Sequence, residues 1–305
     1  MEQKQTQVFQ DFSKQPVQVI TLDDLRRTHL ENYPDGTPVG DIYHCDFFDA
    51  LLEMLNKAGL EYELKEVFAA NNKFKRSPGV TILPEVEKRD GVGSVSSHIL
   101  RRVFANITLK NFGTEVEGYN IAVSYTQLGI IVGFGPMVYA CHNQTICRAE
   151  NIISNYTFRG AEKLKNDSRK LSVMMTLLKA KIAEIGPMAE QDFMTVARLK
   201  NILFTPDLLT EFLGYLTAEH ARFTSANPLY RSSGYPPLTS AQINAFAERM
   251  LPLLTGEAER TTAWDVLNAA NFTIKPASSP FENIAPQAYA LMNSLKGLLM
   301  DYGIR

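Results

Sequence analysis

Apolar residues recur at helical spacing just after Asp46. They fall on one face of a helix and comprise Phe47, Phe48, Leu51, Leu52 and Leu55. Asp46 can cap the first turn, and Gly59 can close the last turn in a left-handed conformation. The pattern therefore predicts a helix that begins at Asp46 and ends at Gly59.

Three runs rich in β-branched and aromatic residues follow, at 102–109, 119–127 and 128–142. Asn111-Phe112-Gly113 and Leu128-Gly129 separate them and predict an antiparallel meander. The third run is almost continuously apolar, which indicates a strand covered on both faces, so helices must pack on it. Upstream, turn residues across 71–97 predict loops around a short strand at 80–83.

After Thr145 the apolar period becomes helical. A long amphipathic helix is marked by Leu171, Met174, Met175, Leu178, Ile182 and Ile185. Gly186-Pro187 should end it, and a second helix should span 188–201. Thr205-Pro206-Asp207 and the Thr239/Gln242 pair have the sequence of helix starts. The last helices should centre on 264–271 and 287–300.

The succession of strands and then helices predicts an α+β fold with a central antiparallel sheet, helices packed on it and a helical C-terminal half. We expect a polar N-terminal arm over 1–40 and one domain over 41–305, β-rich at 80–147 and helical at 148–305. The residues that open the sequence contain no apolar run after a basic stretch, so no signal peptide or membrane span is expected. Three cysteines are too few for a disulfide framework, which favours a cytoplasmic location.

Charge is segregated along the chain, although the net charge is only −2. Residues 71–110 hold 8 basic and 3 acidic residues, and residues 148–200 hold 10 and 6. Between them, 111–147 has no lysine or arginine, and residues 1–70 carry 13 acidic against 6 basic residues. Such asymmetry is typical of a nucleic-acid surface beside an acidic arm, and also of ordinary solvated faces of unlike charge.

Basic residues alternate with aromatic ones in both basic segments. Cations contact phosphates and rings stack on unpaired bases, so this mixture is the chemistry of single-strand binding. The candidate nucleic-acid-binding residues are Lys73, Lys75, Arg76, Arg101, Arg102, Lys163, Lys165, Arg169 and Lys170. Lysine and arginine are also needed for solubility, which is the structural alternative for all nine.

No motif of a phosphate-binding loop, a zinc protease or a serine hydrolase occurs, so no catalytic residue and no cofactor is expected. Cys141, His142 and Cys147, joined by His44 and Cys45, have the chemistry of metal ligands. Their spacing matches no common zinc knuckle, and neighbouring strand residues point to opposite faces. We therefore expect small buried residues rather than a metal site or a catalytic thiol.

Carboxylates at Asp46, Asp49 and Glu53 share a helical face, which could hold a divalent cation or an acid/base pair. A solvated face that suits the helix N-terminus is the preferred interpretation, so we assign no chemistry to these carboxylates. Gly91-Val92-Gly93 and Gly133-Phe134-Gly135 resemble parts of a dinucleotide loop, but neither opens a helix after a strand. We expect a turn at the first and a strand interruption at the second.

The segment Phe134–Asn143 resembles the phage- and plasmid-borne family catalogued as domain of unknown function 932 and its relatives. The resemblance continues at Glu190–Phe193, Leu238–Ile243 and Thr262–Ala269, and loosely covers 40–300. It implies residence on a mobile element and brings no catalytic residues.

The leading hypothesis is a non-enzymatic mobile-element protein that binds single-stranded nucleic acid through 71–110 and 148–170. The alternative is a protein-interaction factor that targets a host or defence protein, with the acidic N-terminal segment imitating a charged surface. An enzyme that uses Cys141 and His142 is a third reading. Partners expected are nucleic acid or a host protein and no membrane; self-association stays open.

Overall fold

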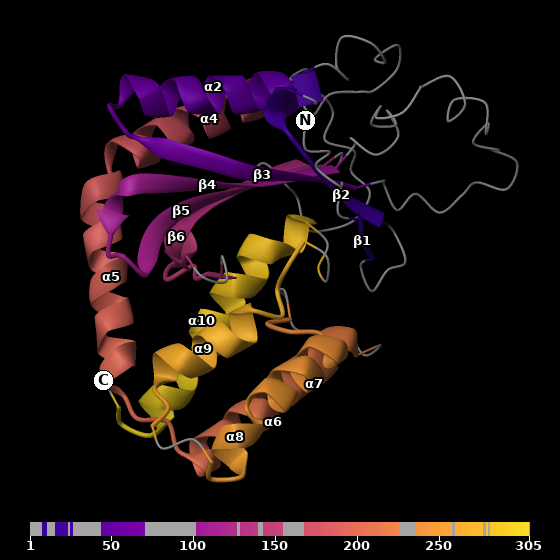
Figure 1. Ribbon diagram of the computed structural model, residues 1–305, viewed down its shortest axis with the longest axis vertical. Helices are drawn as coiled ribbons and strands as arrows, with labels where there is room; N and C mark the ends of the chain where they lie inside the picture. Colours follow the sequence, from indigo (N-terminus) through magenta and orange to yellow (C-terminus); the bar gives the residue numbers. More distant parts are fainter. Residues whose placement is uncertain are drawn as a thin grey trace, which may run out of the picture.

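The chain forms an antiparallel sheet that is covered by helices on both faces (Figure 1). This arrangement confirms the α+β class that the hydrophobic pattern predicts. The computed structural model describes residues 8–10, 16–23, 25–26, 44–70, 102–126, 129–139, 143–154, 168–225, 236–257, 260–276, 279 and 281–304. The strand expected at 80–83 lies outside these residues.

Among the described residues, the sheet has eight strands, and all its pairs are antiparallel. In chain order they are β1 (Val8–Gln10), β2 (Pro16–Ile20), β3 (Tyr62–Ala70), β4 (Arg102–Gly113), β5 (Glu117–Thr126), β6 (Gly129–Val138), β7 (Asn143–Gln144) and β8 (Ile152–Ser154). Strands β1 to β7 lie side by side in sequence order, and β8 pairs with β6. The predicted meander is confirmed as β4, β5 and β6.

The sheet extends beyond the region expected to be β-rich. Strands β1 and β2 come from the segment assigned to a polar arm, and β3 precedes residue 80. Strand β2 pairs with β3 over four residues, from Val17 opposite Ala70 to Ile20 opposite Val67. Part of the N-terminal segment therefore belongs to the sheet, and β8 carries the sheet past residue 147.

Strand β6 is buried from Gly129 to Met137, as its continuous apolar run predicts. Figure 1 shows the reason: α2 (His44–Lys57) and α4 (Ser168–Ala183) lie on one face, and α9 (Ala263–Asn271) and α10 (Ile284–Asp301) lie on the other. Two large apolar clusters result. One contains residues of α2, α4, the start of α5 and the sheet, and the other contains residues of α5 to α10 together with Phe104 and Ala122 of the sheet.

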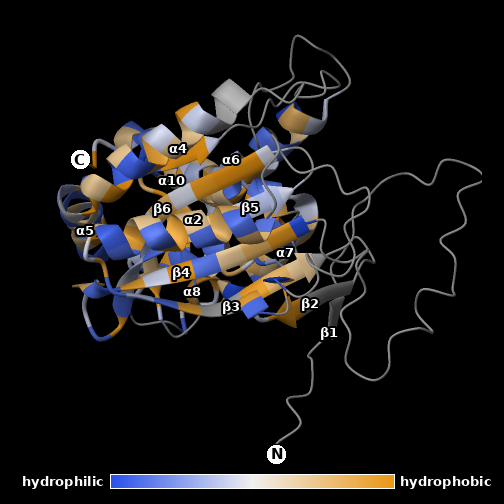
Figure 2. Ribbon diagram, turned by 90° about the horizontal axis from the view of Figure 1, so that it is seen from above, coloured by the Kyte–Doolittle hydropathy of each residue, from blue (hydrophilic) through white to orange (hydrophobic). Residues whose placement is uncertain are grey.

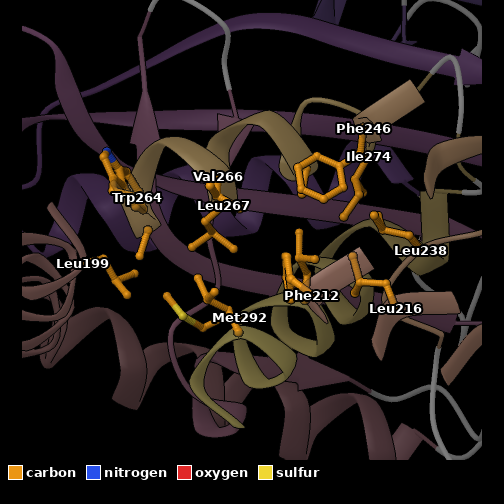
Figure 3. Close-up of a cluster of buried hydrophobic side chains, with 14 of the residues drawn as sticks. Leu199, Phe212, Leu216, Leu238, Phe246, Trp264, Val266, Leu267, Ile274 and Met292 are labelled. Carbon is orange, nitrogen blue, oxygen red and sulfur yellow. The ribbon is translucent and has the colours of Figure 1, made fainter. Parts of the chain in front are cut away.

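The remaining helices are α5 (Ile185–Asn201), α6 (Pro206–Thr224), α7 (Ser240–Arg249) and α8 (Leu251–Leu254), with short 3-10 turns η1 (Ala149–Asn151) and η2 (Phe281–Asn283). Figure 2 shows apolar and polar residues mixed along the helices, as expected where one face of a helix covers a core. Figure 3 shows part of the second cluster, which contains side chains of α6, α7, α9 and α10, among them Phe212, Phe246, Trp264 and Met292.

Two predicted helix starts are confirmed in atomic detail. The Thr205 hydroxyl accepts a hydrogen bond from the Leu208 amide, and Thr239 and Gln242 form a reciprocal capping box.

One helix end differs from its predicted position. We expected Gly186-Pro187 to end the long helix, but α4 already ends at Ala183, and Gly186-Pro187 lie in the first turn of α5. A proline is tolerated there because first-turn amides have no carbonyl partner within the helix.

A glycine in β6 lets the segment that joins β7 to β8 cross close to that strand. A Cβ atom at Gly135 would lie 1.9 Å from the Thr145 carbonyl oxygen. The Thr145 amide donates to the Pro136 carbonyl at 2.8 Å, which holds the crossing segment against the strand. Gly135 is therefore part of a continuous strand and not an interruption, and it is required for close approach of two backbones.

Candidate functional site

The basic residues expected to bind nucleic acid divide into three groups. Lys73, Lys75, Arg76, Arg101, Lys163 and Lys165 lie outside the described residues. Arg169 and Lys170 occupy the first turn of α4, which contains no acidic residue. Arg102 is the first residue of β4, and it is buried.

Arg102 is an internal residue. Its side chain is 6% exposed, its guanidinium lies 3.1 Å from the Glu282 carboxylate, and its Cζ atom lies 5.1 Å from the centroid of the Phe281 ring. These contacts fasten the start of β4 to η2. Because the guanidinium is buried in an ion pair, the structure assigns Arg102 a role in packing and leaves it little surface to offer a phosphate.

Both basic segments are anchored at the same end of the sheet. Strand β3 ends at Ala70 and β4 begins at Arg102, and these two residues pair directly with each other. Residues 71–101 therefore connect two neighbouring strand ends. Residues 155–167 follow Ser154, the last residue of β8. Ser154 lies opposite Ile131, near the start of β6. Strand β4 is joined to β6 through β5, because Val103 pairs with Tyr125 and Tyr125 with Ile130.

The spacing of strands sets how far apart these anchors are. Adjacent strands lie about 4.8 Å apart, so the four steps from β3 to β8 correspond to roughly 19 Å. The strand ends that anchor the two segments therefore lie within the length of a few nucleotides. In contrast, β5 and β6 are buried between helices on both faces of the sheet and offer no open binding platform (Figure 1).

Asp192 is the centre of a buried polar network. Its carboxylate accepts hydrogen bonds from the Tyr119 hydroxyl at 2.8 Å, the Asn151 amide at 2.8 Å and the Arg148 Nε atom at 3.2 Å. Arg148 also donates to the Gln191 side chain and, at 3.3 Å, to the Met188 carbonyl. The network joins β5, η1 and α5.

Burial governs the ionisation of this network. Desolvation raises the pKa of Asp192, and the Tyr119 hydrogen bond and the Arg148 charge oppose that shift. Burial, reinforced by the Asp192 charge, also raises the pKa of the Tyr119 phenol. The side chains of Tyr119 and Asp192 are fully buried, so the arrangement suits fixing α5 to the sheet rather than chemistry on an external substrate.

The cysteines show the behaviour expected of small buried residues. Burial raises the pKa of Cys45 to about 12 and raises the pKa of Cys147 as well. Cys45 lies in the cluster around α2, and Cys147 lies in the cluster formed by the C-terminal helices. Among the described residues no group of three or more His, Cys, Asp or Glu could hold a metal ion; Cys141 and His142 lie outside them.

The carboxylates on α2 are largely engaged in ion pairs. Asp49 lies 2.5 Å from Arg26, and Glu53 lies 2.6 Å from Lys57, while Asp46 stands in the first turn of the helix. Asp49 and Glu53 are thus held by cations of this chain, which supports the reading of a solvated helical face.

A cluster of cations around an exposed ring lies between α7 and α9. The Arg249 Cζ atom is 3.8 Å from the centroid of the Phe272 ring, and the Lys275 Nζ atom is 5.2 Å from it. Lys275 also donates to the Asn143 amide oxygen at 2.5 Å. In the sequence, Phe272 and Lys275 lie close together, like the aromatic and basic residues of the other segments. Arg249 is far from them in sequence, so sequence analysis could not assign it to the same cluster.

Segments that carry the family resemblance meet in the fold. The Asn143 amide donates to the Asn268 backbone carbonyl at 2.9 Å, which joins the first of them to the last. The Trp264 indole donates to the buried Glu117 carboxylate at 2.8 Å, and Lys200 lies 2.7 Å from the same carboxylate. These residues act in packing.

Comparisons of the chain with protein families, with curated proteins and with solved structures find no match. The family resemblance therefore rests on the four segments alone. Within the described residues, no helix is both long enough and apolar enough to cross a membrane.

Proposed function

We propose that this chain is a non-enzymatic protein of a mobile element that binds single-stranded nucleic acid. The observation that carries the proposal is the common anchoring of residues 71–101 and 155–167 at one end of the sheet. Residues 71–101 hold 6 basic residues, 3 acidic residues and Phe74, and residues 155–167 hold 3 basic residues, 2 acidic residues, Tyr156 and Phe158. Both segments thus carry cations and rings, the combination that phosphates and unpaired bases require.

The start of α4 adds to this concentration of charge. Arg169 and Lys170 stand in its first turn, where the helix dipole already presents a partial positive charge and an acidic residue would be stabilising. Cations at this position are unfavourable for the isolated helix. A bound phosphate would offset that cost, because it complements both the side chains and the dipole.

The remaining parts of the proposal rest on the sequence. Residence on a mobile element follows from the family resemblance, and a cytoplasmic location agrees with two buried cysteines, Cys45 and Cys147, that form no disulfide in the structure.

Fluorescence anisotropy with labelled 20-nucleotide single strands of DNA and RNA tests the proposal. We expect binding at low salt, weaker binding to a duplex of the same length, and a steep loss with salt. Six phosphate contacts correspond to a slope of about −4 in a plot of log affinity against log salt concentration. No binding of either strand at low salt would overturn the proposal.

A further inference from the structure

The ring of Phe272 is unusual because it stays partly exposed between two cations. It is 37% exposed, although Arg249 and Lys275 lie within 3.8 and 5.2 Å of its centroid. Phe272 directly follows α9, and Arg249 lies in the last turn of α7, so the two partners are held by separate helices. Part of an aromatic surface with a positive border therefore faces solvent.

A purely structural role explains only part of this arrangement. An arginine near a helix C-terminus is favoured by the dipole, and it can shield a ring from water. Yet Arg249 forms no ion pair with any carboxylate of the described residues, so its charge is not neutralised within that part of the protein. Lys275 is positioned by Asn143, a residue that is 3% exposed.

We infer that Arg249, Phe272 and Lys275 form a binding site for one unpaired nucleotide of a single strand. The base stacks on the exposed part of the Phe272 ring or on the Arg249 guanidinium plane, both of which accept any base. The adjacent phosphate is attracted by Lys275 and Arg249. A base within a duplex is already stacked and paired, so the site selects single strands.

The inference rests on the proposed function and adds a second contact, built from α7 and α9 rather than from the basic segments. Base stacking on an aromatic ring contributes enough that removing the ring should weaken binding by about fivefold to a hundredfold. The site needs no titration or conformational change to operate, because its three side chains are already together.

The test compares Phe272→Leu and Arg249→Gln with the wild-type chain by anisotropy, using a labelled 20-nucleotide single strand. Leucine retains apolar volume but removes the aromatic face. The matched control is Tyr302→Leu, which removes another exposed ring, one that bonds to the acidic Glu211. Circular dichroism melting confirms that each variant is folded.

We expect weaker binding in both site variants and unchanged binding in the control. A strand that carries 5-iodouridine should cross-link under ultraviolet light to Phe272, as located by mass spectrometry. Wild-type affinity in Phe272→Leu and Arg249→Gln would overturn the site and leave the proposed function standing, as would an equal loss in Tyr302→Leu. If the wild-type chain does not bind the strand, both the nucleotide site and the proposed function are overturned. If it binds uridine monophosphate but not the strand, the assignment of the site to single-stranded nucleic acid is overturned.

Discussion

The Tyr119 hydroxyl donates a 2.8 Å hydrogen bond to the Asp192 carboxylate and so joins β5 to α5. Both side chains are fully buried. Asp192→Ala would leave the Tyr119 and Asn151 donors unpaired, and each such loss costs about 1 to 3 kcal/mol. We expect the free energy of unfolding to fall by roughly 3 kcal/mol, measured by urea denaturation. A loss no larger than that of an exposed control, Glu190→Ala, would contradict this.

Asp192→Asn should reveal the ionisation of the carboxyl group. Burial raises the pKa of Asp192, so the folded protein holds this proton at a pH where the unfolded chain has released it. The stability that the carboxyl contributes is therefore complete below about pH 4 and is lost as the pH rises through the folded-state pKa. The advantage of wild type over Asp192→Asn should shrink from pH 4 to pH 8 in denaturation series. A growing advantage would mean that Arg148 and the hydrogen bonds outweigh burial.

Arg102 should affect stability more than nucleic-acid affinity. Its guanidinium pairs with Glu282, and both side chains are largely buried. Arg102→Ala leaves a buried carboxylate without its cation, at a cost of about 3 kcal/mol. The double variant Arg102→Ala/Glu282→Gln should recover part of that loss. Arg102→Ala with wild-type stability and strongly reduced strand binding would instead place Arg102 at the interface.

Gly135→Ala should be strongly destabilising, because its Cβ atom would lie 1.9 Å from the Thr145 carbonyl oxygen and two backbones would have to separate. We expect a loss of at least about 2 kcal/mol. Gly214→Ala is the matched control, since no heavy atom lies within 4 Å of its added Cβ atom in α6. It should stabilise the helix by about 0.5 to 1 kcal/mol. Thermal melting distinguishes the two; equal effects would refute the close-approach argument.

The fold was predictable where local chemistry determines it. The caps at Thr205 and Thr239 and the strands β4 to β6 follow from residues close together in sequence. The helix expected to begin at Asp46 is also present, but it begins earlier, at His44, and Asp46 lies in its first turn instead of capping it. Strand β3 was not predicted because its register shifts between Leu64 and Val67, so the residues that face the core change from even to odd positions. The alternation that identifies a strand is lost at that irregularity.

The candidate site was predictable only as a composition of charge and aromatic residues. Arg102 was grouped with the surface cations because its partner, Glu282, lies 180 residues away. The pairing of Phe272 with Arg249 likewise depends on how α7 packs against α9. Sequence spacing cannot reveal contacts between distant helices, whereas the common anchoring of the two basic segments appears once the strand order is known.

The central claim is that the basic segments at this end of the sheet bind a single strand. Lys73→Glu/Lys75→Glu changes two cations in the first segment, and Lys110→Glu/Arg198→Glu makes the same change in charge at two exposed residues elsewhere. The most direct measurement is the affinity of both variants and of wild type for a labelled single strand across a salt series. We expect the first variant to lose most of its affinity and to show a shallower salt slope, with little change in the second. Equal losses in the two variants, or none in the first, would contradict the account.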